Sequence, residues 1–143
     1  MTLFTIGFTK KTAEQFFETL KQNGIKKLID IRLNNKSQLS GFAKTPDIEY
    51  FLKNAGIEYV YMPEFAPTKG MLDLYQAKKL DWLGYEIKYN LLLLERMPLN
   101  DKDADIFDRA CLLCSENTAD KCHRRLAAEY IANTLKGVRI VHL

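Results

Sequence analysis

Short apolar runs alternate along the chain with longer segments in which apolar residues recur at helical spacing. The short runs predict five strands, over residues 3–6, 27–32, 57–62, 110–114 and 138–142. The longer segments predict helices over 12–23, 46–54, 72–94, 101–110 and 122–135, with Gly84 as the candidate break in the third. Trp82, Tyr85 and Tyr89 share one face of that helix, which is typical of core or interface residues.

This alternation predicts an α/β fold: a single domain over residues 1–143, with a mainly parallel sheet of about five strands and helices on both faces. In such sheets, ligands bind at the carboxyl ends of the strands. The loops expected at that edge carry residues 7–9, 30–32, 64–69 and 114–116, the last together with 122–124. A functional site is therefore expected where these loops meet.

Composition narrows the class of protein. The chain has 143 residues, of which 47% are hydrophobic and 27% charged, as in an ordinary soluble globular protein. Its net charge of +3 permits an anionic ligand but lacks the strong basic stripe of a typical nucleic-acid binder. No apolar run approaches the ~20 residues of a membrane span, so no membrane partner is expected. The leucines at 91–94 predict a buried helix face.

The cysteines indicate a cellular compartment. All three lie between residues 111 and 122, too close together for a disulfide framework. The N-terminus lacks a basic region followed by a long apolar stretch, so no signal peptide is predicted. A reducing, cytoplasmic location is therefore expected.

The run Cys122-His123-Arg124-Arg125 is the most informative feature, because it falls where a helix is predicted to begin. Helix N-termini and nearby arginines favour anions and lower the pKa of a thiol. We therefore expect Cys122 to be partly thiolate near neutral pH, with Cys114 as a candidate resolving partner. His123 is either a general base or a neutral residue that donates to the loop backbone. Glu116 is a general base, an arginine partner or a simple loop carboxylate.

Anion-binding residues are expected on the neighbouring loops. Asp30 and Arg32 are two apart on a strand and share a face, so Asp30 can orient Arg32 through an ion pair while Arg32 holds an anion. One of Arg124 and Arg125 is expected to face the cleft as an anion clamp and the other to face solvent. Neutral donors that could add to this anion site are Asn34, Ser37 and Thr68.

A zinc site is the competing interpretation of Cys111, Cys114, Cys122 and His123. If Cys111 and Cys114 both lie in a strand, an offset of three residues points them to opposite faces. Cys111 is then a small buried apolar residue, and no metal is predicted. Neither standard glycine-rich phosphate loop is present, so a nucleoside triphosphatase or dinucleotide enzyme is disfavoured and no cofactor is expected.

The chain resembles the domain of unknown function 488 family from about Thr5 to Ile131. The residues that carry the resemblance are Gly7, Asp30-Ile31-Arg32, Leu112-Leu113-Cys114-Ser115-Glu116 and Cys122-His123-Arg124. Many members have His or Tyr and then Ser after the first glycine, whereas this chain has Phe8 and Thr9. The resemblance implies the fold and the position of the site, and no particular reaction.

Two functions from different classes fit these residues. In the first, the protein is an enzyme acting on an anionic substrate, such as a phosphate-bearing nucleotide or nucleic-acid derivative, through a Cys/His/Arg site. In the second, it is a non-catalytic module that binds a nucleotide, a nucleic acid or a partner protein. A thiol with a depressed pKa favours the enzyme, whereas ligand affinity alone favours the module.

Overall fold

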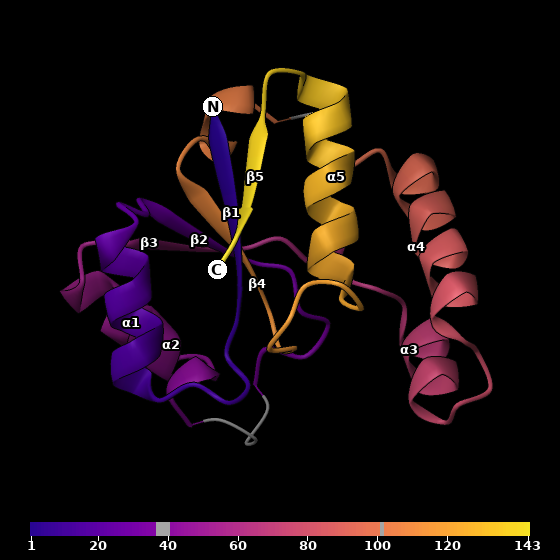
Figure 1. Ribbon diagram of the computed structural model, residues 1–143, viewed down its shortest axis with the longest axis horizontal. Helices are drawn as coiled ribbons and strands as arrows, with labels where there is room; N and C mark the ends of the chain where they lie inside the picture. The colour runs from indigo at the N-terminus through magenta and orange to yellow at the C-terminus, as the bar shows by residue number, and fades with distance from the viewer. Residues whose placement is uncertain (37–40, 101) are drawn as a thin grey trace.

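One five-stranded sheet forms the centre of the computed structural model, which describes residues 1–36, 41–100 and 102–143 (Figure 1). All strands are parallel and run in the order β3-β2-β4-β1-β5. Their bounds are Thr2–Gly7 for β1, Lys27–Asp30 for β2, Glu58–Tyr61 for β3, Ala110–Cys114 for β4 and Arg139–His142 for β5. The predicted parallel α/β class is confirmed.

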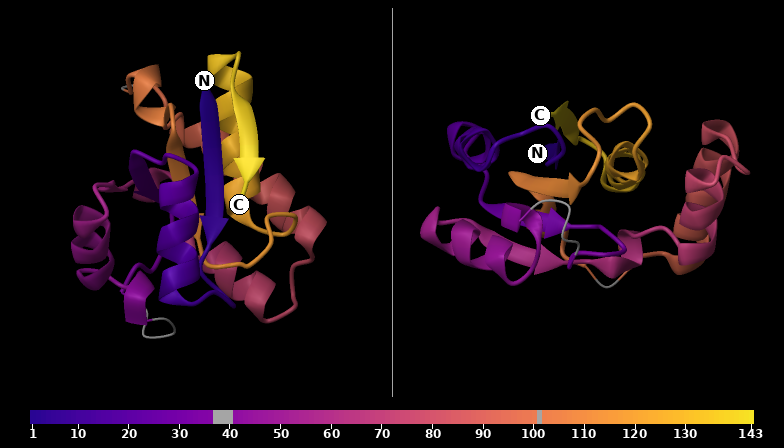
Figure 2. Two further views of the ribbon diagram at one scale, coloured as in Figure 1. Left: turned by 60° about the vertical axis from the view of Figure 1, so that its left-hand side comes forward. Right: turned by 90° about the horizontal axis from the view of Figure 1, so that it is seen from below.

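Helices cover both faces of this sheet (Figures 1 and 2). One face is covered by α1 and α2, the other by α5, and α4 lies outside α5 with α3 below it. The helix bounds are Ala13–Gln22 for α1, Asp47–Asn54 for α2, Lys69–Gln76 for α3, Trp82–Arg96 for α4 and His123–Leu135 for α5. Short 3-10 turns occupy Gly41–Ala43, Pro63–Phe65 and Ala104–Phe107.

The central strand β4 shows how sequence alternation divides the core in two. All five of its residues are buried. Cys111 and Leu113 pack with the residues of α1 and α2, whereas Ala110 and Leu112 pack with those of α4 and α5. Successive side chains of a strand point to opposite faces, so Cys114 lies on the α5 side and Cys111 on the other. The predicted separation of these two cysteines is confirmed.

Two helix predictions differ from the structure. The chain breaks between Gln76 and Trp82, not at Gly84, because Asp81 caps α4 by accepting a hydrogen bond from the Gly84 backbone N–H at 2.8 Å. The expected helix over 101–110 is only the 3-10 turn at 104–107 within its described part. Neither difference moves the sheet or the helix that follows Cys122.

The leucines at 91–94 are only half buried as a group. Leu93 faces the core, whereas Leu91 and Leu94 are 60% and 65% exposed. Within the described parts of the chain, no helix has the length and apolar character needed to cross a membrane.

Gly7 ends β1 against the loop that follows β4. A Cβ placed on Gly7 would overlap the backbone carbonyl of Glu116 and press on the Arg124 guanidinium, whereas a Cβ on Gly70 would meet no heavy atom within 4 Å. We predict that Gly7→Ala lowers the free energy of unfolding by about 1–3 kcal/mol, the usual cost of overpacking. Gly70→Ala is the control, and we expect it to raise the free energy of unfolding by at most about 1 kcal/mol. Urea unfolding of both variants is the measurement, and equal midpoints would contradict the prediction.

Candidate functional site

A cavity of about 530 Å³ opens at the carboxyl edge of the sheet. Its wall is built from the ends of β2 and β4, the start of α5 and the α3–α4 pair. Six residues of the expected site line it, namely Arg32, Asn34, Cys114, Glu116, Cys122 and His123. The carboxyl ends of parallel strands meet at one edge, which explains why residues far apart in sequence share this cavity.

Cys114 and His123 are in direct contact at this wall. The Cys114 Sγ lies 3.3 Å from His123 Nδ1, and His123 Nε2 lies 2.8 Å from the carbonyl oxygen of Ile31. A carbonyl oxygen only accepts hydrogen bonds, so Nε2 carries the proton and a neutral ring leaves the Nδ1 lone pair facing the thiol. The edge of Tyr89 packs on the imidazole with ring centroids 5.6 Å apart, which restrains its rotation. His123 is thus oriented to exchange a proton with Cys114.

The surroundings of Cys114 favour its thiolate. Burial alone would raise the pKa of this thiol. Several neighbouring groups stabilise the thiolate and outweigh this effect of burial, so the pKa is lowered. These groups are the Cys122 side chain, which hydrogen-bonds to the sulfur, the backbone N–H groups of Ser115 and Glu116, and the charge of Arg124.

The pKa of Cys122 shifts in the opposite direction, against the expectation that Cys122 is the ionised thiol. Its hydrogen bond to Cys114, then burial and the negative charge of Cys114, raise the pKa of Cys122 well above the ordinary value. Cys122 is the N-cap residue of α5, yet its side chain caps no backbone N–H of that helix. The backbone N–H groups at the start of α5 therefore do not bind this sulfur, and Cys122 serves Cys114 as a hydrogen-bond donor.

Arg124 stabilises the loop between β4 and α5. It is fully buried and lies outside the cavity wall. Its guanidinium donates to the carbonyl oxygens of Glu116 and Asn117 and, at 3.2 Å, to Thr5 Oγ1. Arg125 instead forms ion pairs with Glu86 and Glu129. Neither arginine takes the expected place of an anion clamp facing the cleft, because the loop carbonyls occupy Arg124 and carboxylates occupy Arg125.

The predicted ion pair between Asp30 and Arg32 is present and buried. Arg32 Nε and Nη2 donate to the two Asp30 carboxylate oxygens at 2.9 and 2.8 Å, and Tyr59 donates to Oδ2 at 2.6 Å. The guanidinium also lies 5.4 Å from the centre of the Phe8 ring. Among the described residues, Arg32 Nη1 has no hydrogen-bond partner, and Arg32 lines the cavity. This nitrogen is thus available to a ligand.

The other expected site residues are dispersed. Asn34 lines the cavity, although its side-chain oxygen accepts a hydrogen bond from the Lys36 backbone. Thr68 caps α3 through Met71 and is not part of the wall. Ser37 lies outside the described residues. The Glu116 carboxylate is exposed and, in the described part of the chain, has no arginine partner, since Arg124 binds its backbone carbonyl instead.

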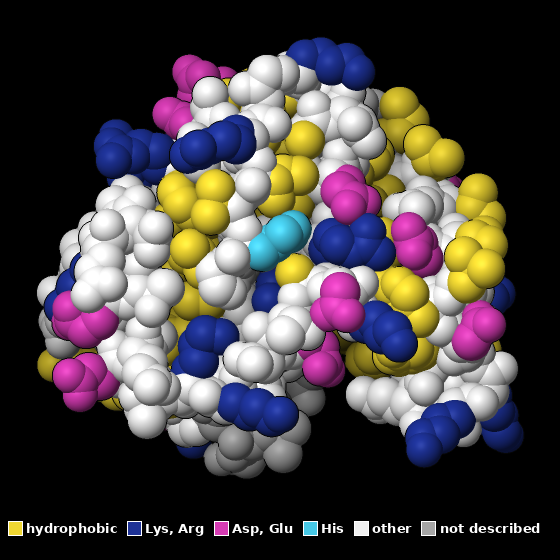
Figure 3. All heavy atoms as spheres, viewed as in Figure 1, with side chains coloured by type: hydrophobic (Ala, Val, Ile, Leu, Met, Phe, Trp, Pro, Cys, Tyr) yellow, Lys and Arg dark blue, Asp and Glu magenta, His cyan; other side chains and the backbone are white. Residues whose placement is uncertain are grey.

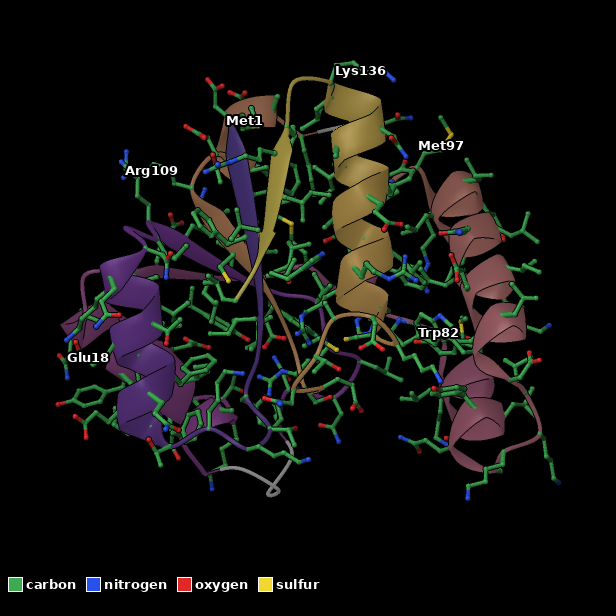
Figure 4. All side chains as sticks on the ribbon, in the orientation of Figure 1. Met1, Glu18, Trp82, Met97, Arg109 and Lys136 are labelled. Carbon is green, nitrogen blue, oxygen red and sulfur yellow. The ribbon has the colours of Figure 1, made fainter. Side chains whose placement is uncertain are left out.

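Sequence reasoning missed the outer wall of the cavity, which α3, α4 and the loop before α5 supply. Trp82 and Tyr85 stack with centroids 5.2 Å apart, and Arg125 covers the indole of Trp82, which Figure 4 labels at the start of α4. Both aromatic residues line the cavity, together with Lys69 and Lys121. Their helical spacing was visible in the sequence, but it does not reveal that this face turns toward Cys114.

Cys114, Cys122 and His123 are also a potential set of metal ligands. Their two sulfurs and the imidazole nitrogen lie within 4.8 Å of one another. Two thiolates and one imidazole suit zinc, and three protein ligands with an open fourth position are typical of catalytic zinc sites. The bond from His123 Nε2 to a carbonyl is also common in metal-binding histidines. The prediction of no metal was argued against a four-residue ligand set that includes Cys111. That argument does not apply to this three-residue set.

Cys114 and the run Cys122-His123-Arg124 lie in a segment of the chain that matches a protein-family model. The family model described as "Domain of unknown function DUF488" matches residues 12–131, and the chain belongs to that family. Comparison with curated proteins and with solved structures gave no significant match. The family resemblance expected from the sequence is therefore confirmed.

The different environments of the three cysteines predict an order of reactivity. We expect Cys114 to be alkylated by iodoacetamide at lower pH than an ordinary thiol, and before Cys122 and Cys111, because only its pKa is lowered. Cys122→Ala should raise the midpoint of Cys114 alkylation by about one pH unit, the worth of one hydrogen bond. Cys122→Ser keeps a hydroxyl donor and should raise it less. Peptide mapping by mass spectrometry, in the presence of a chelator, is the measurement.

Cys111 is the internal control for this experiment. It is fully buried on the other face of the sheet, and burial raises the pKa of its thiol. Alkylation of Cys122 before Cys114, or identical profiles for the Ala and Ser variants, would contradict the assignment.

Proposed function

We propose that this protein is an enzyme that uses Cys114 as a nucleophile, with His123 as its proton acceptor and donor, on an anionic substrate bound in the cavity. The observation that carries the proposal is the 3.3 Å contact between Cys114 Sγ and His123 Nδ1 on the wall of a cavity large enough for a small molecule. An oriented imidazole beside a thiol of lowered pKa is the arrangement that nucleophilic catalysis by cysteine requires.

The chemistry follows from the donors around the sulfur. His123 Nδ1 takes the Cys114 proton, and the resulting imidazolium pairs with the thiolate. The sulfur electron pair then forms a bond to an electrophilic centre of the substrate. The bond from that centre to its leaving group breaks, and the leaving group departs with the electron pair and takes the proton from Nδ1. Ser115 and Glu116 contribute backbone N–H groups that hold the sulfur in place.

Substrate binding is assigned to the cationic and aromatic parts of the wall. Arg32 is fixed by Asp30 on one side, so Nη1 can meet a phosphate or carboxylate without loss of side-chain freedom. Lys121 adds a second positive charge at the wall, whereas Lys69 is paired with Asp73 at 2.6 Å. Trp82 and Tyr85, which stack on each other, make the facing part of the wall apolar. A phosphate-bearing molecule with an apolar part, such as a nucleotide derivative, fits this combination.

The proposal predicts that the charge of a small electrophile affects its reaction with Cys114. Iodoacetate carries a carboxylate and iodoacetamide does not, while both alkylate thiolates. We expect Arg32→Met to lower the ratio of the iodoacetate rate to the iodoacetamide rate about tenfold, since a charge a few ångströms away contributes roughly 1–4 kcal/mol. Arg32→Lys keeps the charge and should keep most of the ratio. Rates are measured at Cys114 by mass spectrometry, on variants whose thermal unfolding shows that they are folded.

The variant Cys114→Ala distinguishes an enzyme from a binding module. Wild type and variant are each mixed with inorganic phosphate, nucleoside monophosphates and the activated esters of these nucleotides. For an enzyme, we expect an activated ester to leave a covalent mass adduct on Cys114, which Cys114→Ala abolishes while phosphate affinity stays within about twofold. Ligand affinity without an adduct or turnover in the wild type would favour the non-catalytic module. Equimolar zinc content, with no alkylation until a chelator is added, would favour a metal centre.

A further inference from the structure

An apolar stripe runs along the outer side of α4. Leu83, Ile87, Leu91 and Leu94 are 52–65% exposed, and Met97 just beyond the helix is 51% exposed. Steps of three and four residues place them on one side of the helix. Figure 3 shows apolar side chains along this edge of the molecule, and Figures 1 and 2 show α4 as its outermost helix. A contiguous patch of this kind is at the upper end of what monomeric proteins expose.

The opposite side of α4 is already occupied. Tyr85, Tyr89 and Leu93 are buried in the core shared with α5. The stripe is therefore not needed to hold α4 on the protein. Helix α4 itself has 15 residues, or about 22 Å at 1.5 Å per residue, and the stripe runs along most of it, which is long enough for a helix–helix interface.

Two charges beside the stripe indicate what could cover it. Lys88 follows Ile87 and Glu95 follows Leu94, so both lie on the same flank, two turns apart. Both are exposed, and among the described residues neither forms an ion pair. If two copies of α4 packed in parallel about a two-fold axis, the flank with Lys88 and Glu95 would lie on opposite sides of the interface in the two copies, and neither charge would find a partner. In antiparallel packing centred near Leu91, each Lys88 approaches Glu95 of the second copy.

We propose that the outer side of α4 is the interface of a homodimer, in which two α4 helices pack antiparallel about a two-fold axis close to Leu91. Ile87 of one copy then faces Leu94 of the other, and the apolar core has Lys88–Glu95 pairs on its rim. This arrangement is self-complementary, as a two-fold interface requires. Stable interfaces bury about 800 Å² per partner, so the stripe with its polar rim suits a dimer of moderate affinity.

The first test is the molecular mass in solution over a concentration series, by sedimentation equilibrium. The wild type is expected to be a dimer that dissociates on dilution. Leu91→Glu places two like charges at the axis and should weaken dimerisation at least about a hundredfold. Tyr50→Glu is the control, because Tyr50 is 64% exposed on α2, across the sheet from α4. A monomeric wild type, or a Leu91→Glu variant that still dimerises, would overturn the proposal.

The second test concerns the direction of packing. Lys88→Glu and Glu95→Lys should each weaken the dimer about tenfold, because each turns two attractive contacts into repulsive ones. The double variant Lys88→Glu/Glu95→Lys reverses both charges and should restore the wild-type affinity to within about twofold. Failure of the double variant to recover would overturn the antiparallel arrangement. Within the described part of the chain, neither residue takes part in an ion pair of its own copy, so the fold should tolerate all three variants.

A third test locates the axis. Leu91→Cys puts a thiol at the two-fold axis, where it meets itself, whereas Leu83→Cys puts one near the end of the stripe. Under mild oxidation, Leu91→Cys should form a disulfide-linked dimer and Leu83→Cys should not. The native cysteines are buried and should not cross-link. Equal cross-linking at both positions would overturn the register. If the stripe binds a lipid surface instead, vesicle flotation would depend on Leu91 while the protein in solution stayed monomeric.

Discussion

The buried guanidinium of Arg124 is the constraint on which the candidate site depends. It is the largest fully buried side chain of those described, and its partners there are neutral oxygens of Thr5, Glu116 and Asn117. A buried cation without a carboxylate partner is costly unless another negative group is near. A thiolate at Cys114 would supply that charge, and the charge of Arg124 in turn helps to lower the pKa of Cys114.

The same arginine gives the site its shape. By binding the carbonyls of Glu116 and Asn117, it fixes the loop after β4 so that the N–H groups of Ser115 and Glu116 reach the Cys114 sulfur. This loop can approach β1 closely only because Gly7 has no side chain there. The positions of Gly7, Arg124 and the Cys114 sulfur therefore depend on one another.

The sequence was sufficient to predict the sheet and the edge where the site lies, because strand alternation and the strand-end rule are local signals. It could not assign the two thiols. Cys122 at a helix start looked like the favoured thiolate, but its side chain turns to Cys114 and not to the helix N–H groups. It also could not show that Arg124 would be buried, because that depends on where the loop carbonyls lie in three dimensions. The pairing of Asp30 with Arg32 was predictable because the two residues are neighbours in sequence, although β2 itself ends at Asp30.

Helix α4 connects the chemistry to the outer surface. Its inner side supplies Tyr85 to the cavity wall and supports His123 through Tyr89, and its outer side carries the apolar stripe. The sheet edge with Cys114 is held from several directions, whereas α4 rests mainly on α5 and α3. A second copy packed on the stripe would restrain this less supported wall. The Cys114 sulfur would then belong to the rigid part of the fold, and the shape of the cavity would depend on how α4 is held.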